Sequence, residues 1–210
     1  YQDAAYAQRY RAVVDKVRAA EAPLQRGSAL SEAVARYLFK LMAVKDEYEV
    51  ARLHTDKSFT DRIATMFEGD VKLTHHLAPP LLAATNERGE LVKSAFGPWV
   101  RSAFGLLAKL KGLRGSALDV FGRTAERRME RQLIADYLAC IDELLASLSA
   151  DNLARAAEIA RIPEEIRGFG HVKERHVKAA RAKWDALMAA WRTGTPVSAT
   201  TPDRAPASGG

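Results

Sequence analysis

The sequence predicts a mainly α-helical fold with one small β-hairpin or strand pair near residues 69–96. Apolar residues recur at three- and four-residue intervals through most of the chain, which is the spacing of one helix face. Between residues 69 and 98 this period fails, because apolar and polar residues alternate around Val71 and two adjacent prolines break the chain. We therefore expect several helices with a single β element between them.

The first half of the chain carries four predicted helices. They cover residues 3–21, a second stretch that starts at an N-cap on Ser31, residues 46–53 and residues 59–67. Pro23 and Gly27 end the first helix, and the Ser31 hydroxyl is of the kind that caps a helix start. The third helix is highly charged, and the spacing of Lys45 and Glu49 predicts an ordinary i, i+4 ion pair.

Four further helices are predicted in the second half, over residues 98–110, 125–148, 152–161 and 172–191. The longest follows an N-cap on Thr124, and the last carries a continuous apolar stripe that includes Trp184. Residues 193–210 are rich in Pro, Ser, Thr and Gly and show no period, so we expect a disordered tail. The chain should thus form one helical domain over residues 1–192.

Composition limits the classes of function. The chain has 210 residues, 48% of them hydrophobic, and a net charge of +6, which favours acidic partners. The single cysteine, Cys140, lies among apolar neighbours and is expected to be a small core residue. No apolar run reaches the roughly twenty residues of a membrane-spanning helix, and the first residues do not have the pattern of a secretory signal. We expect a soluble, cytoplasmic protein that does not bind a membrane.

The residue types that bind metals or perform catalysis do not cluster in the sequence. The histidine pairs are His75 with His76 and His171 with His176, and neither spacing is that of a ligand pair on one helix face. One cysteine cannot hold an iron–sulfur cluster, which needs about four. Nucleotide-binding glycine loops and nucleophile elbows are also missing. We therefore predict no catalytic, cofactor-binding or metal-binding residue within this chain.

One polar turn, at residues 167–173, is the best candidate for a contact site. Residues 161–192 hold eight Lys or Arg and four Asp or Glu, so +4 of the net +6 lies there. The glycines of the turn permit a sharp bend, and a helix starts just after it, which leaves amide groups free for an anion. Lys173 falls on the apolar side of that helix. The predicted anion or interdomain contact comprises Arg167, His171 and Lys173. An equally open alternative is that Glu164, Glu165 or Glu174 satisfies the turn from within.

A second group of cations lies at the start of the longest helix. It consists of Arg123, Arg127, Arg128 and Arg131, and Glu126 and Glu130 alternate with these residues. Pairing within the helix should neutralise much of this charge. Aromatic residues that would stack on bases are missing from both basic regions. A nucleic-acid partner is therefore not expected, although a free-standing basic helical nucleic-acid-binding module remains the alternative function.

Five separated segments resemble one known region in the same order. They are YLFKLMAVKDEYEVARLHT (37–55), HLAPPLLA (76–83), FGPW (96–99), LRGSALDVFGRTAERRMERQLIADY (113–137) and IPEEIRGFGHVK (162–173). Together they resemble the C-terminal domain of the bacterial indolepyruvate ferredoxin oxidoreductase family, over about residues 1–191. Val44 and Val120 depart from an aromatic residue and a proline at these places, which affects local packing only.

The resemblance implies a part in the oxidative decarboxylation of arylpyruvates such as indolepyruvate to acyl-CoA. In that family thiamine diphosphate carries the acyl group, CoA accepts it, and iron–sulfur clusters pass electrons to ferredoxin. The residues for these steps lie in earlier segments of one long polypeptide, so none is carried over to this chain. The expected role is noncatalytic: packing against the catalytic domains of the same polypeptide, assembly of a homo-oligomer, or ferredoxin docking. The helical pattern already running at Tyr1 fits the end of such a polypeptide.

A third possible function is that of a small independent enzyme that uses Glu47, His75 or His171 for acid–base chemistry. The coding sequence upstream of residue 1 distinguishes such an enzyme from a domain of the oxidoreductase.

Overall fold

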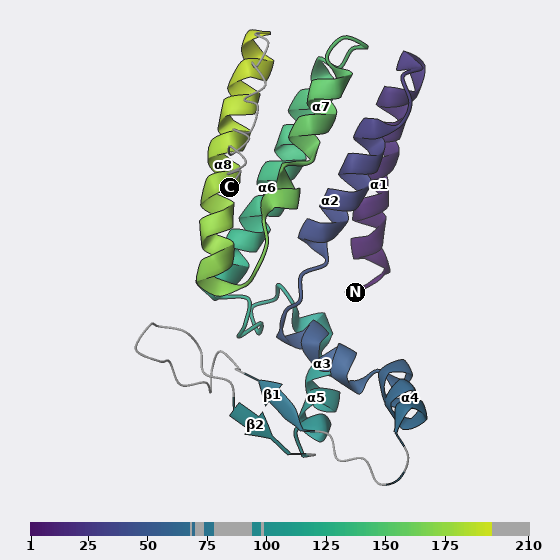
Figure 1. Cartoon of the computed structure of the whole chain (residues 1–210), viewed down its shortest axis with the longest axis vertical. Coiled ribbons are helices and arrows are strands. Elements are labelled where there is room, and N and C mark those ends of the chain that lie inside the picture. Colours follow the sequence, from purple (N-terminus) through teal and green to yellow (C-terminus); the bar gives the residue numbers. More distant parts are fainter. Residues whose placement is uncertain (68, 70–73, 78–93, 98, 195–210) are drawn as a thin grey trace, which may run out of the picture. The chain divides into compact units, whose positions relative to one another are not determined.

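A computed structural model describes residues 1–67, 69, 74–77, 94–97 and 99–194, and its fold is mainly α-helical (Figure 1). The elements in chain order are α1 (Ala4–Glu21), η1 (Ala22–Leu24), α2 (Ala29–Met42), α3 (Glu47–Thr55), α4 (Lys57–Met66), β1 (His75–Leu77), β2 (Ser94–Phe96), α5 (Val100–Lys109), η2 (Leu110–Leu113), α6 (Ala125–Ala146), α7 (Leu153–Ala160), η3 (Ile162–Glu165) and α8 (Gly170–Thr193). The η elements are short 3₁₀ helices. Within these described ranges, no helix has an apolar stretch long enough to span a bilayer.

The sequence predicted both the mainly helical fold class and the position of the strand pair. Each of the eight predicted helices has a counterpart with bounds that differ by a few residues. Strands β1 and β2 pair antiparallel, with His75 opposite Phe96 and Leu77 opposite Ser94, so the predicted strand pair is confirmed. The rest of the segment between these strands, and residues 195–210 of the expected tail, lie outside the described residues.

The contacts between residues divide the chain into two compact units, where the sequence indicated one domain over residues 1–192. Unit 1 comprises Tyr1–Ala12 and Lys40–Asp136, and unit 2 comprises Val13–Phe39 and Tyr137–Gly210. The boundaries fall inside α1 and α6 and near the end of α2, so these helices contribute residues to both units.

Unit 2 is a helical bundle with an apolar core. Helices α6 and α8 pack through Trp184, whose ring lies 6.0 Å from that of Tyr137 and whose Nε1 donates to the Cys140 sulfur at 3.2 Å. The Tyr137 hydroxyl donates to the Ala160 carbonyl at the end of α7, at 2.9 Å. Burial raises the pKa of the Cys140 thiol to about 11, so this residue behaves as the core residue that the sequence predicted.

The start of α2 differs from the prediction. The helix begins at Ala29, two residues before the expected N-cap, and Ser31 lies within its first turn. The carboxylate of Glu21, at the end of α1, accepts hydrogen bonds from the backbone N–H of Leu30 and of Ser31, at 2.9 and 2.8 Å. The buried side chain of Glu21 therefore satisfies free amides in the first turn of α2, and Ser31 is a residue of that turn and not the N-cap.

In unit 1, helices α3 and α5 lie against each other (Figure 1). The ring of His54 on α3 stacks on Phe104 of α5, with centroids 5.5 Å apart and an interplanar angle of 26°. Asp46 caps α3, since its side chain accepts from the Glu49 backbone N–H at 2.8 Å. One face of helix α5 thus packs on α3. Asp46, the cap residue of α3, also belongs to the polar network of this unit.

Candidate functional site

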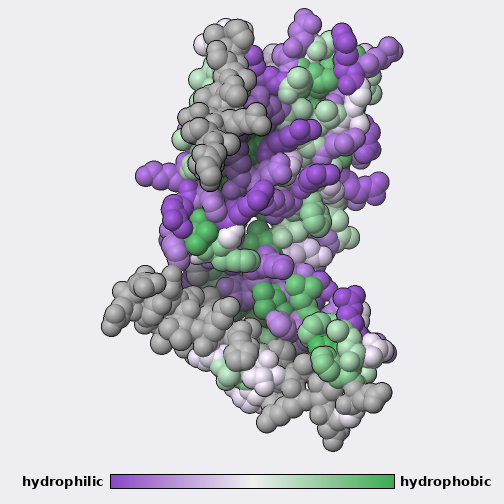
Figure 2. Space-filling view, in the orientation of Figure 1, coloured by the Kyte–Doolittle hydropathy of each residue, from purple (hydrophilic) through white to green (hydrophobic). Residues whose placement is uncertain are grey.

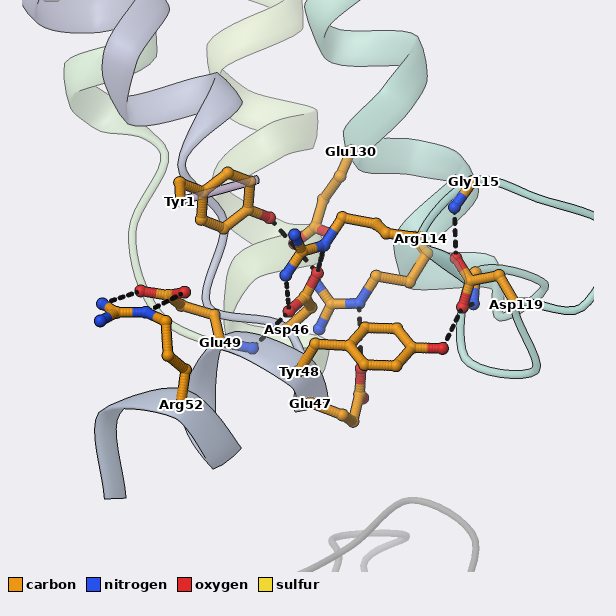
Figure 3. A network of polar contacts seen from close by, with 12 residues as sticks. Tyr1, Asp46, Glu47, Tyr48, Glu49, Arg52, Arg114, Gly115, Asp119 and Glu130 are labelled. Atoms are coloured by element: carbon orange, nitrogen blue, oxygen red, sulfur yellow. Dashed lines mark hydrogen bonds and ion pairs between the residues drawn. The ribbon is translucent and has the colours of Figure 1, made fainter. Parts of the chain in front are cut away.

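The largest group of polar contacts in the described part of unit 1 centres on a buried ion pair (Figure 3). Arg114, which follows η2, binds both carboxylate oxygens of Asp46, with Nε at 2.5 Å and Nη2 at 2.8 Å. Only 12% of the Arg114 side chain and 7% of the Asp46 side chain are exposed. A bidentate, desolvated pair of this kind holds two segments in a fixed orientation.

Two tyrosines enclose the guanidinium of Arg114 (Figure 3). Its central carbon lies 4.3 Å from the ring centroid of Tyr1 and 5.5 Å from that of Tyr48, within the range of cation–π attraction. The Tyr1 hydroxyl donates to Asp46 at 3.3 Å. Burial, together with the negative charge of Asp46, raises the pKa of Tyr1, so this hydroxyl stays protonated.

The loop between η2 and α6 is closed by the carboxylate of Asp119. It accepts from the backbone N–H of Gly115 at 2.7 Å, from that of Gly122 at 2.9 Å and from the Tyr48 hydroxyl at 3.2 Å. Burial acts to raise the pKa of Asp119, but these hydrogen bonds outweigh it and lower the pKa. For the donor of this last hydrogen bond, burial and the negative charge of Asp119 raise the pKa of the Tyr48 hydroxyl to about 12.

A second group of charges joins α3 to α6. Arg127 binds Glu130 closely through Nη1, while its Nε lies 3.8 Å from Glu47 Oε2. That oxygen is buried and makes no hydrogen bond to the described residues. Burial raises the pKa of Glu47, and Arg127 offsets this only in part because Glu130 is its closer partner. Of the four cations predicted to be neutralised within this helix, Arg127 pairs with Glu130, whereas Arg123 donates to the Ala117 carbonyl at 2.6 Å, so the prediction holds for Arg127.

The predicted ion pair between Lys45 and Glu49 is wrong. Glu49 instead binds Arg52, with Arg52 Nη2 at 2.7 Å and Nε at 2.9 Å. Lys45 precedes the N-cap Asp46, so it does not share a helix face with Glu49.

Together these contacts brace unit 1, and we call the network the brace. Its members are Tyr1, Asp46, Glu47, Tyr48, Arg114, Asp119, Arg127 and Glu130. Its groups come from the N-terminus, from the start of α3, from the loop after η2 and from the start of α6, and almost all of them bind one another. Such an arrangement fixes the chain path and presents little charge to a ligand.

The predicted contact turn lies in unit 2 and is closed partly by its own atoms. Arg167 Nε donates to the carbonyl of Glu164 at 3.2 Å, and Nδ1 of His176 lies 2.8 Å from the carbonyl of Arg167. Since a carbonyl only accepts, Nδ1 carries the proton. Gly168 has φ +85°, and a Cβ there would lie 2.7 Å from Val172 Cγ1, so the glycine is required.

The three predicted contact residues differ in exposure. Arg167 and His171 are exposed, and Lys173 is half-buried, in agreement with its predicted place on the apolar side of α8. Two of the three glutamates that could satisfy the turn have partners outside it: Glu164 accepts from the Tyr37 hydroxyl at 2.6 Å, and Glu165 pairs with Lys183 at 2.5 Å. These placements leave the anion contact a prediction.

Arg167 also borders a groove of about 540 Å³ in unit 2, formed by α7, η3, the start of α2 and Lys183 of α8. Three cations and three carboxylates line it, so it has no net charge of either sign. Of the residues named for an independent enzyme, Glu47 lies near Arg127, His75 is in β1, and His171 is in the first turn of α8. Across the described ranges, no three His, Cys, Asp or Glu side chains gather as a metal site.

Unit 1 also exposes large apolar side chains. They are Met66 and Phe67 at the end of α4, Trp99 and Leu106 on α5, and Leu118 and Val120 in the following loop, each more than half exposed. Hydrophobic surface is visible over α4 in Figure 2. Among the described residues, unit 2 has two side chains that are more than half exposed in the same way, Phe39 and Phe169, at 61% and 70%.

Comparison with known proteins identifies the class of this helical domain. It is one whose members share a sequence profile without an assigned activity. The chain belongs to the Family of unknown function (DUF6537), which matches residues 1–186. No curated protein and no solved structure gives a significant match.

The sequence alone did not reveal the Asp46–Arg114 pair, because the two residues lie 68 positions apart. The sequence predicted Asp46 as the first residue of a helix, whereas it is the N-cap of that helix. His176 was missed as well, since its partner is a backbone carbonyl, which has no sequence signature.

Proposed function

We propose that this chain is a noncatalytic helical domain of a thiamine-diphosphate-dependent indolepyruvate (2-oxoacid) ferredoxin oxidoreductase. It supports domain packing, assembly or docking while the parent enzyme, a cytoplasmic homo-oligomer, oxidatively decarboxylates arylpyruvates to acyl-CoA. Thiamine diphosphate, iron–sulfur clusters and the CoA site belong to other segments of the parent.

The observation that carries this proposal is the apolar surface of unit 1. Trp99 and Leu106 are 64% and 63% exposed, and few of the described residues of this unit are large, buried apolar side chains. A domain that functions alone gains nothing from such exposure, whereas a domain within a larger polypeptide buries it against its neighbours.

The five segments that carry the resemblance also support it. Two of them, residues 37–55 and 113–137, supply Asp46, Tyr48, Arg114 and Asp119 to one network. Two segments that resemble the same family thus contribute side chains to one network, which supports the proposal.

The test begins with the coding sequence upstream of residue 1. A continuous reading frame should encode thiamine-binding and 2-oxoacid oxidoreductase segments. The intact polypeptide should then oxidise indolepyruvate with CoA and ferredoxin, and the isolated 210-residue chain should not. A start codon directly before residue 1, or decarboxylase activity in the isolated chain, would overturn the proposal. Salt-sensitive binding of the chain to duplex DNA or RNA would instead favour the nucleic-acid-binding alternative.

A further inference from the structure

The groove of unit 2 is hollow because small side chains line it. Four of its residues lie on α7 or at the C-cap of that helix, namely Ala154, Ala157, Glu158 and Arg161. Their spacing i, i+3, i+4, i+7 is that of a single helix face. Two of the four are alanines, and Ala29 at the start of α2 adds a third, so about 540 Å³ stays open. Pockets for small molecules measure roughly 300–1,000 Å³.

Three of the charged side chains in this groove are already bound within unit 2. Glu165 pairs with Lys183 at 2.5 Å, so these two charges offset each other. The Glu164 carboxylate accepts from the Tyr37 hydroxyl at 2.6 Å. In the described part of the chain, no ion pair joins Glu164 or Glu165 to an arginine of the groove.

The other three charged side chains have unused hydrogen-bonding groups. The side chains of Arg161 and Glu158 make no hydrogen bond or ion pair to the residues that the structure describes. Among the same residues, Arg167 donates through Nε alone, to the Glu164 carbonyl at 3.2 Å, and its Nη1 and Nη2 stay available. Two guanidinium groups and one carboxylate are therefore open to a ligand in this groove.

The two arginines are tied to the same backbone segment. The Glu164 N–H donates to the Arg161 carbonyl at 2.8 Å, and the Glu164 carbonyl accepts from Arg167 Nε. The bond to Nε holds the Arg167 guanidinium and leaves its two terminal amino groups as a fork, which is the geometry that binds two oxygens of one oxyanion. Because this cation is held in place before a ligand arrives, it loses little freedom on binding.

The unused charges follow an order along α7. Arg161 lies at the end of the helix, where η3 and then Arg167 follow. Glu158 lies three residues earlier, about 4.5 Å along the axis at 1.5 Å per residue. The groove therefore offers two positive groups towards η3 and one negative group a turn away. Its complement is a doubly charged anion with a single cation beside it.

We infer that the groove of unit 2 binds a small molecule that carries a phosphate monoester and an ammonium group. The phosphate, with a charge near −2 at pH 7, binds Arg161 and Arg167, and the ammonium group binds Glu158. The alanines accommodate the carbon chain between them. A carboxylate has two oxygens and fills one guanidinium fork, whereas a phosphate monoester has three terminal oxygens for two. This site lies beyond the proposed function and does not depend on it.

Calorimetric titration of the whole 210-residue chain with matched small molecules tests the chemistry. O-Phosphoethanolamine has both charged groups. Inorganic phosphate lacks the ammonium group, β-alanine has a carboxylate in place of the phosphate, and glycerophosphoethanolamine is a singly charged diester like a lipid headgroup. We expect phosphoethanolamine to bind at least about fivefold more tightly than each of the others, with an affinity that falls as salt is added. Equal or tighter binding of any of the three, or no binding of phosphoethanolamine at 10 mM, overturns the inference.

Variants assign the two charged groups of the ligand to their residues. Arg161→Gln and Arg167→Gln should each weaken phosphoethanolamine and inorganic phosphate by about fivefold or more, and Arg167→Lys should not restore binding because it lacks the fork. Glu158→Gln should weaken phosphoethanolamine alone and leave inorganic phosphate unchanged or tighter. An equal loss of both ligands in Glu158→Gln would contradict the ammonium site.

Two further variants separate a built site from general attraction to positive charge. Ala154→Phe fills the groove at an exposed position without changing a charge, so it should weaken every ligand. The matched control R175Q/K178Q removes two exposed cations of α8 outside the groove and should leave binding unchanged. Circular dichroism verifies that each variant is folded. A loss in the control as large as in the arginine variants, or full binding by Ala154→Phe, overturns the inference.

Discussion

The two units stabilise themselves in different ways. Unit 2 has an apolar core built from α6, α7 and α8, in which even Cys140 and the Trp184 N–H are enclosed. In the described part of unit 1 the buried apolar residues are few, namely Leu41, Met42, Tyr48, Ala51, Val100 and Leu133. The ion pair and carboxylate contacts of the brace hold its helices and loops together, and several of its large apolar side chains are exposed. Unit 2 thus depends on apolar packing, and the described part of unit 1 depends more on buried polar contacts.

Breaking one buried ion pair should have the largest effect. Asp46→Ala leaves the Arg114 guanidinium buried without its counter-charge and removes the cap of α3, so we expect a loss of about 3–5 kcal/mol in the free energy of unfolding. Urea denaturation followed by circular dichroism measures it. The control, Asp142→Ala, breaks the exposed pair with Lys16 in unit 2 and should cost under about 1 kcal/mol. Equal small losses would show that unit 1 does not depend on the brace.

The same substitution in both units sharpens the comparison. Leu144→Ala removes a side chain of 0% exposure from the core of unit 2 and should cost about 2–5 kcal/mol. Leu106→Ala removes one that is 63% exposed on α5 and should change stability by no more than about 0.5 kcal/mol. Thermal unfolding of the two variants side by side is the measurement. A large loss of stability for Leu106→Ala would mean that this exposed side chain of α5 stabilises the isolated chain.

The carboxylate of Asp119 should make unit 1 sensitive to acid. Its pKa is lowered in the folded chain, so its stabilising contribution is complete above the unfolded pKa of about 3.9 and is lost as the pH falls through the folded value. Asp119→Asn should cost about 1–3 kcal/mol at pH 7, because the carboxylate accepts two backbone N–H groups, and the difference from the original chain should shrink below pH 4. The exposed Asp151→Asn serves as the control. A difference that stays constant down to pH 2 would exclude the charge as its cause.

Local patterns in the sequence were sufficient for the helices and the strand pair, since both depend on periods of two or three to four residues. The polar contacts between distant residues were not predictable in the same way. In unit 2, Glu21 accepts from the Leu30 N–H nine residues further on. In unit 1, Arg114 binds Asp46 only after α3 and α5 have packed. The division into two units was also hidden, because its boundaries fall within or near the ends of helices whose period is continuous. The predicted turn was found in sequence from its glycines, yet its closure by His176 depends on the first turns of α8.

The smallest expected effect is a gain in stability. Burial raises the pKa of Glu47, so the folded chain favours the protonated form. A carboxyl group with a raised pKa contributes most below its unfolded pKa of about 4.3, and that contribution is lost as the pH rises through the folded value. Ionised Glu47 therefore costs stability at pH 7. Glu47→Gln keeps the shape and removes the charge, and since Arg127 retains Glu130, we expect a gain of at most about 1 kcal/mol at pH 7 that shrinks towards pH 4.

Urea denaturation at both pH values measures this gain, with the exposed Glu174→Gln in unit 2 as the matched control. A loss at pH 7 would mean that the attraction between Glu47 and Arg127, at 3.8 Å, exceeds the cost of burying the carboxylate. The attraction to Arg127 would then make Glu47 a stabilising member of the brace. A gain would mean that ionised Glu47 destabilises unit 1 at pH 7, and the comparison between the two units then rests on the Asp46–Arg114 pair and the Asp119 loop.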